Sequence, residues 1–349
     1  MERFELIHLG WDDDWTSQLH DFAHSGTIGR ISRVERGECD VLVELGLIRA
    51  QSDSQRSQSD IAPVTGDWVT VIKDDENWLI ESVLDRRTEL VRRDPGERET
   101  QQPLSANVDV VFLVHGFDRP FRSGKLERFL VLAWNSGATP VVVLTKSDLA
   151  TPEQLEELPA VVAAVSPGVE VVVSSIESRE GLARIEELLS PHKTGTMLGE
   201  SGAGKSSLVN ALLNSDVQET AEVRRSDAKG RHTTITRDLL VLDSGGILID
   251  TPGIRAVGLW DAQDALERVF SDILETAADC KFRDCAHEGE PACAVRDAVD
   301  DGRIDFRRLE RFRAMAAELE ESEQRVIERK RSSRSGRSGR TGRGGKRRR

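Results

Sequence analysis

The chain has 349 residues, of which 38% are hydrophobic and 31% are charged, and its net charge is −13. This length predicts two or three domains, and the composition is that of a soluble globular protein. No apolar run approaches the roughly 20 residues of a membrane span, and the N-terminus lacks the pattern of a signal peptide. We therefore expect a cytoplasmic protein without a membrane partner.

The charge is distributed unevenly along the chain. The last 20 residues hold ten Lys or Arg and no acid, so the remainder has 38 basic against 61 acidic residues, a net charge of −23. An acidic body repels polyanions, and nucleic-acid contact is expected from local basic surface or from the tail. A salty habitat would explain the same acidity.

Residues 1–99 are assigned to an OB-fold β-barrel with an N-terminal extension. The expected strands lie within 29–43, with a turn at 36–38, and over 66–72 and 78–83, and a loop is expected at 51–60. Several short strands separated by turns favour a small barrel, and the OB-fold is a common nucleic-acid platform. The residues alone leave open whether the barrel binds RNA or only supports its neighbour.

Residues 100–256 are assigned to an α/β domain. Continuous apolar strands are expected at 108–114, 140–144 and 169–173, with helices at 125–135 and 152–165. Buried strands that alternate with helices predict a parallel sheet covered on both faces.

The segment 199–207 has the G-x4-G-K-S pattern of a phosphate loop. It consists of Gly199, Glu200, Ser201, Gly202, Ala203, Gly204, Lys205, Ser206 and Ser207. The glycines let backbone N–H groups curl around phosphate, Lys205 reaches the β and γ phosphates, and the Ser206 hydroxyl ligates Mg²⁺. An expected strand before the segment and an expected helix after it support this reading, since a helix N-terminus attracts anions.

A second nucleotide motif follows the buried strand at 247–250. Asp250 is expected to hold Mg²⁺ through water, and the N–H of Gly253 is expected to sense the γ-phosphate. The loop 229–234 lies between the two motifs. One of its threonines should close over Mg²⁺; we favour Thr234, although the spacing also allows Thr233.

The residue after Gly253 bears on catalysis. Many GTPases place Gln there to orient the attacking water, whereas this chain has Ile254, which has no polar side-chain atom. We expect His232, in the preceding loop, to position the water. The alternative is a surface histidine with no role.

Residues 145–148 match a base-reading motif and consist of Thr145, Lys146, Ser147 and Asp148. Asp148 can accept hydrogen bonds from guanine N1–H and the 2-amino group, and the Lys146 stem would cover the base. The usual first residue is Asn, so Thr145 predicts reduced affinity. Ser174 and Ser175 follow the next strand and belong to the loop expected at the guanine O6.

The order of these motifs is rotated. The base-reading motif normally follows both phosphate motifs, but here it precedes the phosphate loop by about fifty residues. The sequence therefore predicts a circularly permuted P-loop GTPase domain that uses GTP with Mg²⁺.

Residues 257–329 are assigned to a mostly helical domain, with helices at 261–278 and 305–330. Between them lie four soft or borderline metal ligands, Cys280, Cys285, His287 and Cys293. In a chain without secretion signals this spacing favours one tetrahedral structural Zn²⁺. The alternative is three free cysteines beside a surface histidine.

The basic tail, 330–349, is rich in Arg, Gly and Ser and is expected to be disordered. Its positive charge predicts an RNA-binding arm. A solvated, disposable extension is the alternative.

Taken together, the chain resembles the bacterial ribosome small-subunit-dependent GTPase A family. The resemblance covers nearly the whole chain: residues 65–69 in the barrel, the rotated GTPase motifs, the loop 230–234 and the metal ligands. It implies GTP hydrolysis stimulated by the small ribosomal subunit during its late maturation, with the barrel and zinc domains contacting the subunit and its rRNA. It also implies that His232 takes part in hydrolysis. Thr145 and the tail depart from the family pattern.

Two other functions fit the motifs. One is a GTP-gated RNA-binding chaperone or checkpoint in which hydrolysis serves only for release. The other is an ATP-using RNA enzyme, which requires that Asp148 does not read guanine. No feature of the sequence demands a dimer, so a monomer is expected.

Overall fold

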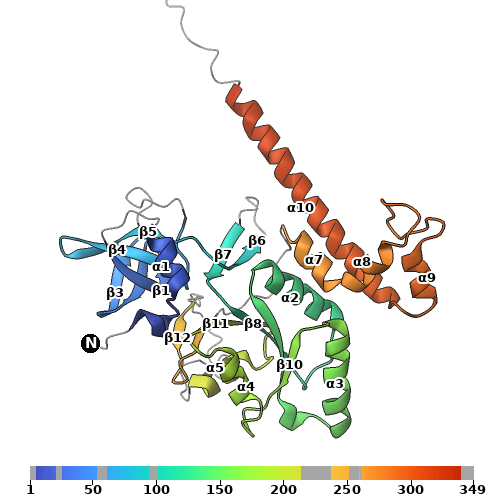
Figure 1. The fold of residues 1–349 in the computed structure, drawn as a ribbon, viewed down its shortest axis with the longest axis horizontal. Helices are drawn as coiled ribbons and strands as arrows, with labels where there is room; N and C mark the ends of the chain where they lie inside the picture. The colour runs from blue at the N-terminus through green and yellow to red at the C-terminus, as the bar shows by residue number, and fades with distance from the viewer. Residues whose placement is uncertain are drawn as a thin grey trace, which may run out of the picture. The chain divides into compact units, whose positions relative to one another are not determined.

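The computed structural model describes residues 5–20, 26–52, 61–93, 101–213, 237–250, 259 and 261–338. The chain divides into two compact units, 1–257 and 258–349 (Figure 1). The first unit holds a β-barrel and an α/β sheet, and the described part of the second is helical.

A closed five-stranded barrel forms the N-terminal part of the first unit. Its strands are β1 (Thr27–Glu35), β2 (Glu38–Val43), β3 (Gly46–Gln51), β4 (Trp68–Asp74) and β5 (Asn77–Val83). They are ordered β1-β2-β3-β5-β4, and β4 pairs back to β1. The β3–β5 pair is parallel and the other four pairs are antiparallel. The predicted OB-fold barrel is confirmed.

Small and β-branched side chains fill the barrel. Its buried core consists of Ile31, Cys39, Val41, Val43, Ala50, Val69, Val71, Ile80 and Val83. The strands approach closely at Gly29, where a Cβ would lie 2.5 Å from Cγ1 of Val41. Glycine is required there because any side chain would overlap the core.

A buried arginine joins the barrel to the segments around it. The guanidinium of Arg30 donates to the carbonyl oxygens of Leu9, Gly66 and Asn107. Burial lowers the pKa of Arg30 to about 10. Leu9 ends the N-terminal η1 (Leu6–Leu9), which precedes α1 (Asp13–His20), and Asn107 follows the antiparallel pair β6 (Glu89–Arg93) and β7 (Gln101–Ala106).

A six-stranded sheet forms the centre of the α/β domain. Its strands are β8 (Val110–Gly116), β9 (Thr139–Thr145), β10 (Glu170–Val173), β11 (Thr194–Gly199), β12 (Leu239–Val241) and β13 (Ile247–Ile249). Their order is β10-β9-β8-β11-β13-β12, and only the β12–β13 pair among these is antiparallel. The predicted parallel α/β architecture is confirmed.

Helices cover the sheet, and the alternation along β8 assigns its two faces. Phe112 and Val114 pack in one cluster with side chains of α4 (Leu182–Leu188) and α5 (Lys205–Leu213). Leu113 instead lies beside Leu126 and Phe129 of α2 (Ser123–Asn135). The remaining helix, α3 (Pro152–Val165), contacts α2 and β10. Because successive side chains of a strand point to opposite faces, a strand buried on both faces is apolar throughout.

The second unit contains α7 (Gln263–Val269), α8 (Ser271–Ala277), α9 (Ala294–Asp300) and α10 (Phe306–Ser338). The prediction of one helix over 261–278 is wrong, because the chain breaks at the buried Phe270. Arg308 stabilises the break: it donates to the carbonyl oxygen of Val269 at 2.8 Å and pairs with both carboxylate oxygens of Asp272.

Helix α10 also corrects the predicted start of the tail. It continues through Ser338, so residues 330–338 are helical rather than disordered. Extending an existing helix costs far less than starting one, and this stretch contains no proline. Residues 339–349 lie outside the described residues. None of the described helices has both the length and the apolar character needed to cross a membrane.

Candidate nucleotide site and metal centre

The sheet brings four predicted nucleotide segments to one edge. Residues 145–148 follow β9, residues 174–175 follow β10, the phosphate loop follows β11, and Asp250 follows β13. These strands run parallel, so their carboxyl ends share an edge of the sheet, where ligands bind open α/β sheets.

The phosphate loop has a backbone shape that depends on its glycines. Gly199, Gly202 and Gly204 have φ values of 156°, 77° and 94°. A Cβ at Gly199 would lie 2.3 Å from the carbonyl oxygen of Val114. Glycine alone adopts such values without strain, and the loop leads directly into α5, whose first residue is Lys205.

Lys205 binds the loop that it follows. Its Nζ donates to the carbonyl oxygens of Gly199 and Glu200, at 2.8 Å in each case. The ammonium is thereby held inside the curve of the loop, and Ser206 and Ser207 lie in the first turn of α5. A lysine in this position and a helix N-terminus both favour a bound phosphate.

Thr145 and Lys146 connect the base-reading segment to the phosphate loop. The hydroxyl of Thr145 donates to the carbonyl oxygen of Ala203 at 2.6 Å. Nζ of Lys146 donates to the carbonyl oxygen of Gly202 at 2.9 Å. Thr145 therefore makes a loop-to-loop hydrogen bond without the amide that is more usual at this position.

The carboxylate of Asp148 is held by the next predicted segment. Oγ of Ser175 donates to Oδ1 of Asp148 at 2.5 Å, and both Ser174 and Ser175 are almost fully buried. Ser147 supports the same arrangement, because its N–H donates to the carbonyl oxygen of Ser174 and its hydroxyl donates to Glu180. The geometry restrains a carboxylate at the strand ends, as recognition of a purine with N–H donors requires.

Asp250 lies at the carboxyl end of β13, next to the strand that carries the phosphate loop. Its N–H donates to the carbonyl oxygen of Asp238 at 3.0 Å. The other predicted phosphate and catalytic residues, His232, Thr233, Thr234 and Gly253, lie outside the described residues.

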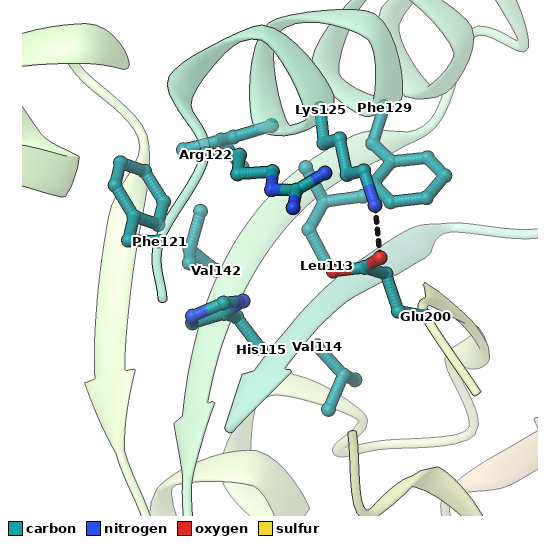
Figure 2. A pocket seen from close by; sticks show the side chains of 10 residues that line it. Leu113, Val114, His115, Phe121, Arg122, Lys125, Phe129, Val142 and Glu200 are labelled. Atoms are coloured by element: carbon teal, nitrogen blue, oxygen red, sulfur yellow. Dashed lines mark hydrogen bonds and ion pairs between the residues drawn. The ribbon is translucent and has the colours of Figure 1, made fainter. Parts of the chain in front are cut away.

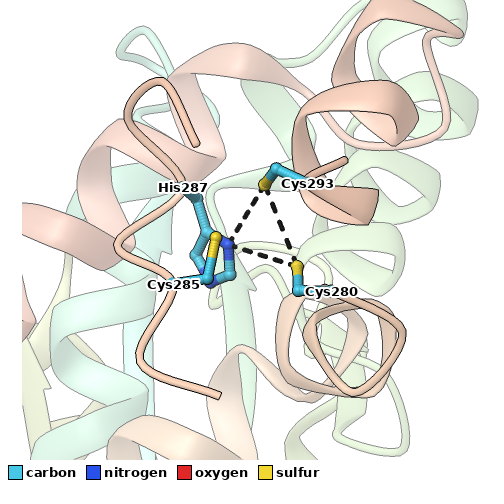
Figure 3. A group of neighbouring side chains, drawn as sticks. All are labelled: Cys280, Cys285, His287 and Cys293. Atoms are coloured by element: carbon cyan, nitrogen blue, oxygen red, sulfur yellow. Dashed lines mark hydrogen bonds between the residues drawn. The ribbon is translucent and has the colours of Figure 1, made fainter. Parts of the chain in front are cut away.

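The four predicted metal ligands of the second unit converge on one point (Figure 3). Their ligand atoms all lie within 4.8 Å of one another. Cys280 follows α8, Cys285 and His287 lie in the connecting loop, and Cys293 directly precedes α9. The helical elements thus bring together residues that are up to thirteen positions apart.

The distances among these atoms fit a tetrahedral zinc site. Cys280 Sγ lies 3.9 Å from Cys293 Sγ and 3.7 Å from His287 Nδ1, which lies 3.4 Å from Cys293 Sγ. With Zn–S near 2.3 Å and Zn–N near 2.0–2.1 Å, a tetrahedron requires about 3.8 Å between two sulfurs and about 3.5 Å between sulfur and nitrogen. Burial lowers the pKa of His287, which favours the neutral imidazole that a metal needs.

Comparison with known proteins agrees with this geometry. The family model described as RsgA GTPase matches residues 83–260. A small ribosomal subunit biogenesis GTPase RsgA of Streptomyces avermitilis is 44% identical over 325 residues, 92% of this chain and 86% of the relative. Its counterpart in Methanosarcina acetivorans is 38% identical over 313 residues, 89% of this chain and 84% of the relative.

The chain belongs to the RsgA GTPase family. Family members are GTP hydrolases, so the chain is an enzyme that hydrolyses GTP. The crystal structure of YjeQ from Thermotoga maritima, 29% identical, superposes with a TM-score of 0.62 over 84% of this chain and 98% of that one. YloQ, described as a circularly permuted GTPase, is 27% identical with a TM-score of 0.59, over 85% and 96%. The predicted circular permutation is confirmed.

A pocket beside the phosphate loop of this family member contains residues that the sequence did not single out (Figure 2). His115, Phe121 and Arg122 line it together with Lys125, which pairs with Glu200 of the loop. The ammonium of Lys125 lowers the pKa of Glu200. Their one sequence signal is their position at the end of the apolar strand β8, which contains His115, or in the residues that follow it.

The barrel contacts residues 237–238, which follow the loop 229–234 in the sequence. Arg33 of β1 pairs with both carboxylate oxygens of Asp238, and the Thr65 hydroxyl donates to the carbonyl oxygen of Arg237. Residues 237–238 immediately precede β12. In this RsgA GTPase the barrel is therefore connected to the segment that follows the loop 229–234 in the sequence.

Proposed function

We propose that this GTPase binds the small ribosomal subunit and its rRNA, and that the subunit stimulates GTP hydrolysis during late subunit maturation. The supporting observation is its 44% identity, over 92% of the chain, to a protein named as a small ribosomal subunit biogenesis GTPase. It acts as a monomer in the cytoplasm, without a membrane partner.

The nucleotide assignment follows the edge of the sheet. Asp148 reads guanine, Lys146 covers the base, and the loop 199–207 cradles the phosphates, as its glycine backbone and the contacts of Lys205 support. Ser206, Asp250 and Thr234 would hold Mg²⁺, which neutralises charge that develops on the phosphates.

Hydrolysis depends on a water molecule that Ile254 cannot orient. His232 positions this water, and the N–H of Gly253 contacts the γ-phosphate. Replacing His232 by Ala should leave GTP affinity unchanged and lower kcat. His192→Ala is a matched control, because His192 precedes β11 and contacts the carbonyl oxygen of Gly245 at the opposite end of the sheet. Equal kcat for His232→Ala and the parent would refute the assignment.

Each domain has a separate role in this proposal. Residues 1–99 contact rRNA, 100–256 hydrolyse GTP, and 257–329 contact the subunit around one structural Zn²⁺ held by the four ligands described above. Residues 330–349 supply positive charge for RNA. The contact between Arg33 and Asp238 supports a connection between subunit binding at the barrel and the nucleotide edge.

GTP turnover with and without purified small subunits tests the proposal. Activators raise the rates of other GTPases by about 10³–10⁵-fold, and a comparable stimulation is expected here. Large subunits at the same concentration are the control. Equal turnover with either subunit, or with none, would refute a small-subunit-dependent function.

A further inference from the structure

The base-reading segment and the phosphate loop follow strands that are not neighbours. Strand β8 lies between β9 and β11. Adjacent strands are about 4.8 Å apart, so the two nucleotide segments start about 10 Å apart. The loop after β8, residues 117–122, emerges between them, and its first N–H, from Phe117, donates to the carbonyl oxygen of Thr145.

Asp118 in this loop binds the base-reading lysine. Its Oδ2 accepts a hydrogen bond from Nζ of Lys146 at 2.7 Å, and its Oδ1 accepts one from Nε of Arg119 at 3.3 Å. Although partial burial opposes the shift, these bonds lower the pKa of Asp118, which stays ionised at neutral pH. A Cβ at Gly116 would lie 2.4 Å from Oδ1, so glycine leaves the room that this carboxylate occupies.

Arg119 binds the phosphate loop. Its two terminal nitrogens donate to the carbonyl oxygens of Ser201, at 2.9 Å, and Gly202, at 2.7 Å. The oxygen of Gly202 also accepts the bond from Lys146. Two cationic side chains, Arg119 and Lys146, thus hold the backbone carbonyl groups of the phosphate loop and polarise the peptide units that contain them.

We propose that Asp118 and Arg119 are positioning residues that join the two halves of the nucleotide site. They hold the Lys146 stem and the phosphate loop in the arrangement that a bound guanine nucleotide needs. The proposal rests on the guanine site proposed above. Neither residue has a role in the bond-breaking step, so their loss weakens the binding of GDP and GTP alike and leaves kcat nearly unchanged.

The test compares Arg119→Gln, Arg119→Lys and Asp118→Asn in the full-length protein, using a fluorescent GDP analogue for Kd and dissociation rate and GTP turnover for KM and kcat. Arg119→Gln and Asp118→Asn should raise Kd about tenfold, which corresponds to about 1.4 kcal/mol. Arg119→Lys, which keeps the charge but not the two-pronged contact, should give an intermediate Kd. The matched control is Arg184→Gln, since Arg184 pairs with Glu170 and Glu187 in the same domain but does not touch the nucleotide segments.

The proposal is overturned by a Kd in both Arg119→Gln and Asp118→Asn within twofold of the parent, or by a lower kcat with unchanged Kd. A rise in Kd that Arg184→Gln shows equally also overturns it. The guanine site is tested separately by Asp148→Asn, which should bind GDP more weakly and xanthosine diphosphate more tightly than the parent does. If that exchange occurs while the Asp118 and Arg119 variants bind normally, only the positioning role fails.

Discussion

Thr145→Val tests whether the hydroxyl of this side chain holds the phosphate loop in the conformation that binds nucleotide. Valine has nearly the shape of threonine but no donor, so the change removes the 2.6 Å hydrogen bond to the carbonyl oxygen of Ala203. Ala203 is only 1% exposed, so water cannot readily replace the donor. A buried acceptor that loses its partner costs about 1–3 kcal/mol.

This cost is divided between folding and nucleotide binding. Without this hydrogen bond the phosphate loop can leave the conformation that binds nucleotide. The population of that conformation then falls, and the apparent Kd for GDP rises in proportion. Full transfer of 1–3 kcal/mol to binding would raise the Kd for GDP about 5-fold to 150-fold. We expect an increase within this range, together with faster GDP dissociation.

The measurement is the GDP dissociation rate by stopped-flow fluorescence, with thermal unfolding alongside. Thr88→Val is the matched control, because the Thr88 hydroxyl donates to the carbonyl oxygen of Val108, just before the amino end of β8. It should lower Tm without changing GDP affinity. If Thr145→Val lowers Tm in the same way and binds GDP like the parent, the hydrogen bond stabilises the fold alone and the reasoning is wrong.

Three further predictions follow from the described contacts. Cys293→Ser should reduce bound zinc well below one ion per chain and unfold the helical unit. A metal-release assay measures the zinc and circular dichroism the helix content. Full zinc retention would contradict the assigned ligands. A double-mutant cycle on Arg33 and Asp238, measured by urea unfolding, should give a coupling free energy of about 0.5–1 kcal/mol, because the pair is partly exposed; additive effects would mean no coupling. Glu200→Gln should lower the free energy of unfolding by less than about 1 kcal/mol at neutral pH. Since Lys125 lowers the pKa of Glu200, this difference from the parent should shrink as pH falls below the ordinary glutamate pKa of about 4.3, whereas a pH-independent difference would exclude the ion pair.

Local patterns predicted the elements around the nucleotide site well. The helix expected at 152–165 is α3, and the strand expected at 140–144 is the interior of β9. Both segments have strong local signals: a capping box at Thr151 begins α3, and an unbroken apolar run forms β9. The G-x4-G-K-S spacing also predicted the phosphate-loop backbone, since only glycine suits the φ values at its bends.

Elements that depend on distant partners were missed. Strand β3 alternates weakly, with exposed Leu47 and buried Ala50, and its structure depends on pairing with β2 and β5. The break at Phe270 depends on Arg308, which is almost forty residues away in sequence. A local sequence window contains none of these distant partners. Periodicity alone therefore predicted one continuous helix over 261–278.

The sequence by itself identified the candidate side chains for binding phosphate, base and metal, and the rotated order of their motifs, because these depend on residue type and short spacing. The tertiary structure decided how the segments support one another. Asp118, Arg119 and Arg33 match no nucleotide motif, and they contact the nucleotide edge only because the sheet places β8 between β9 and β11 and the barrel packs beside β12. Such contacts join residues far apart in the chain, so strand order in space, rather than local pattern, brings them together.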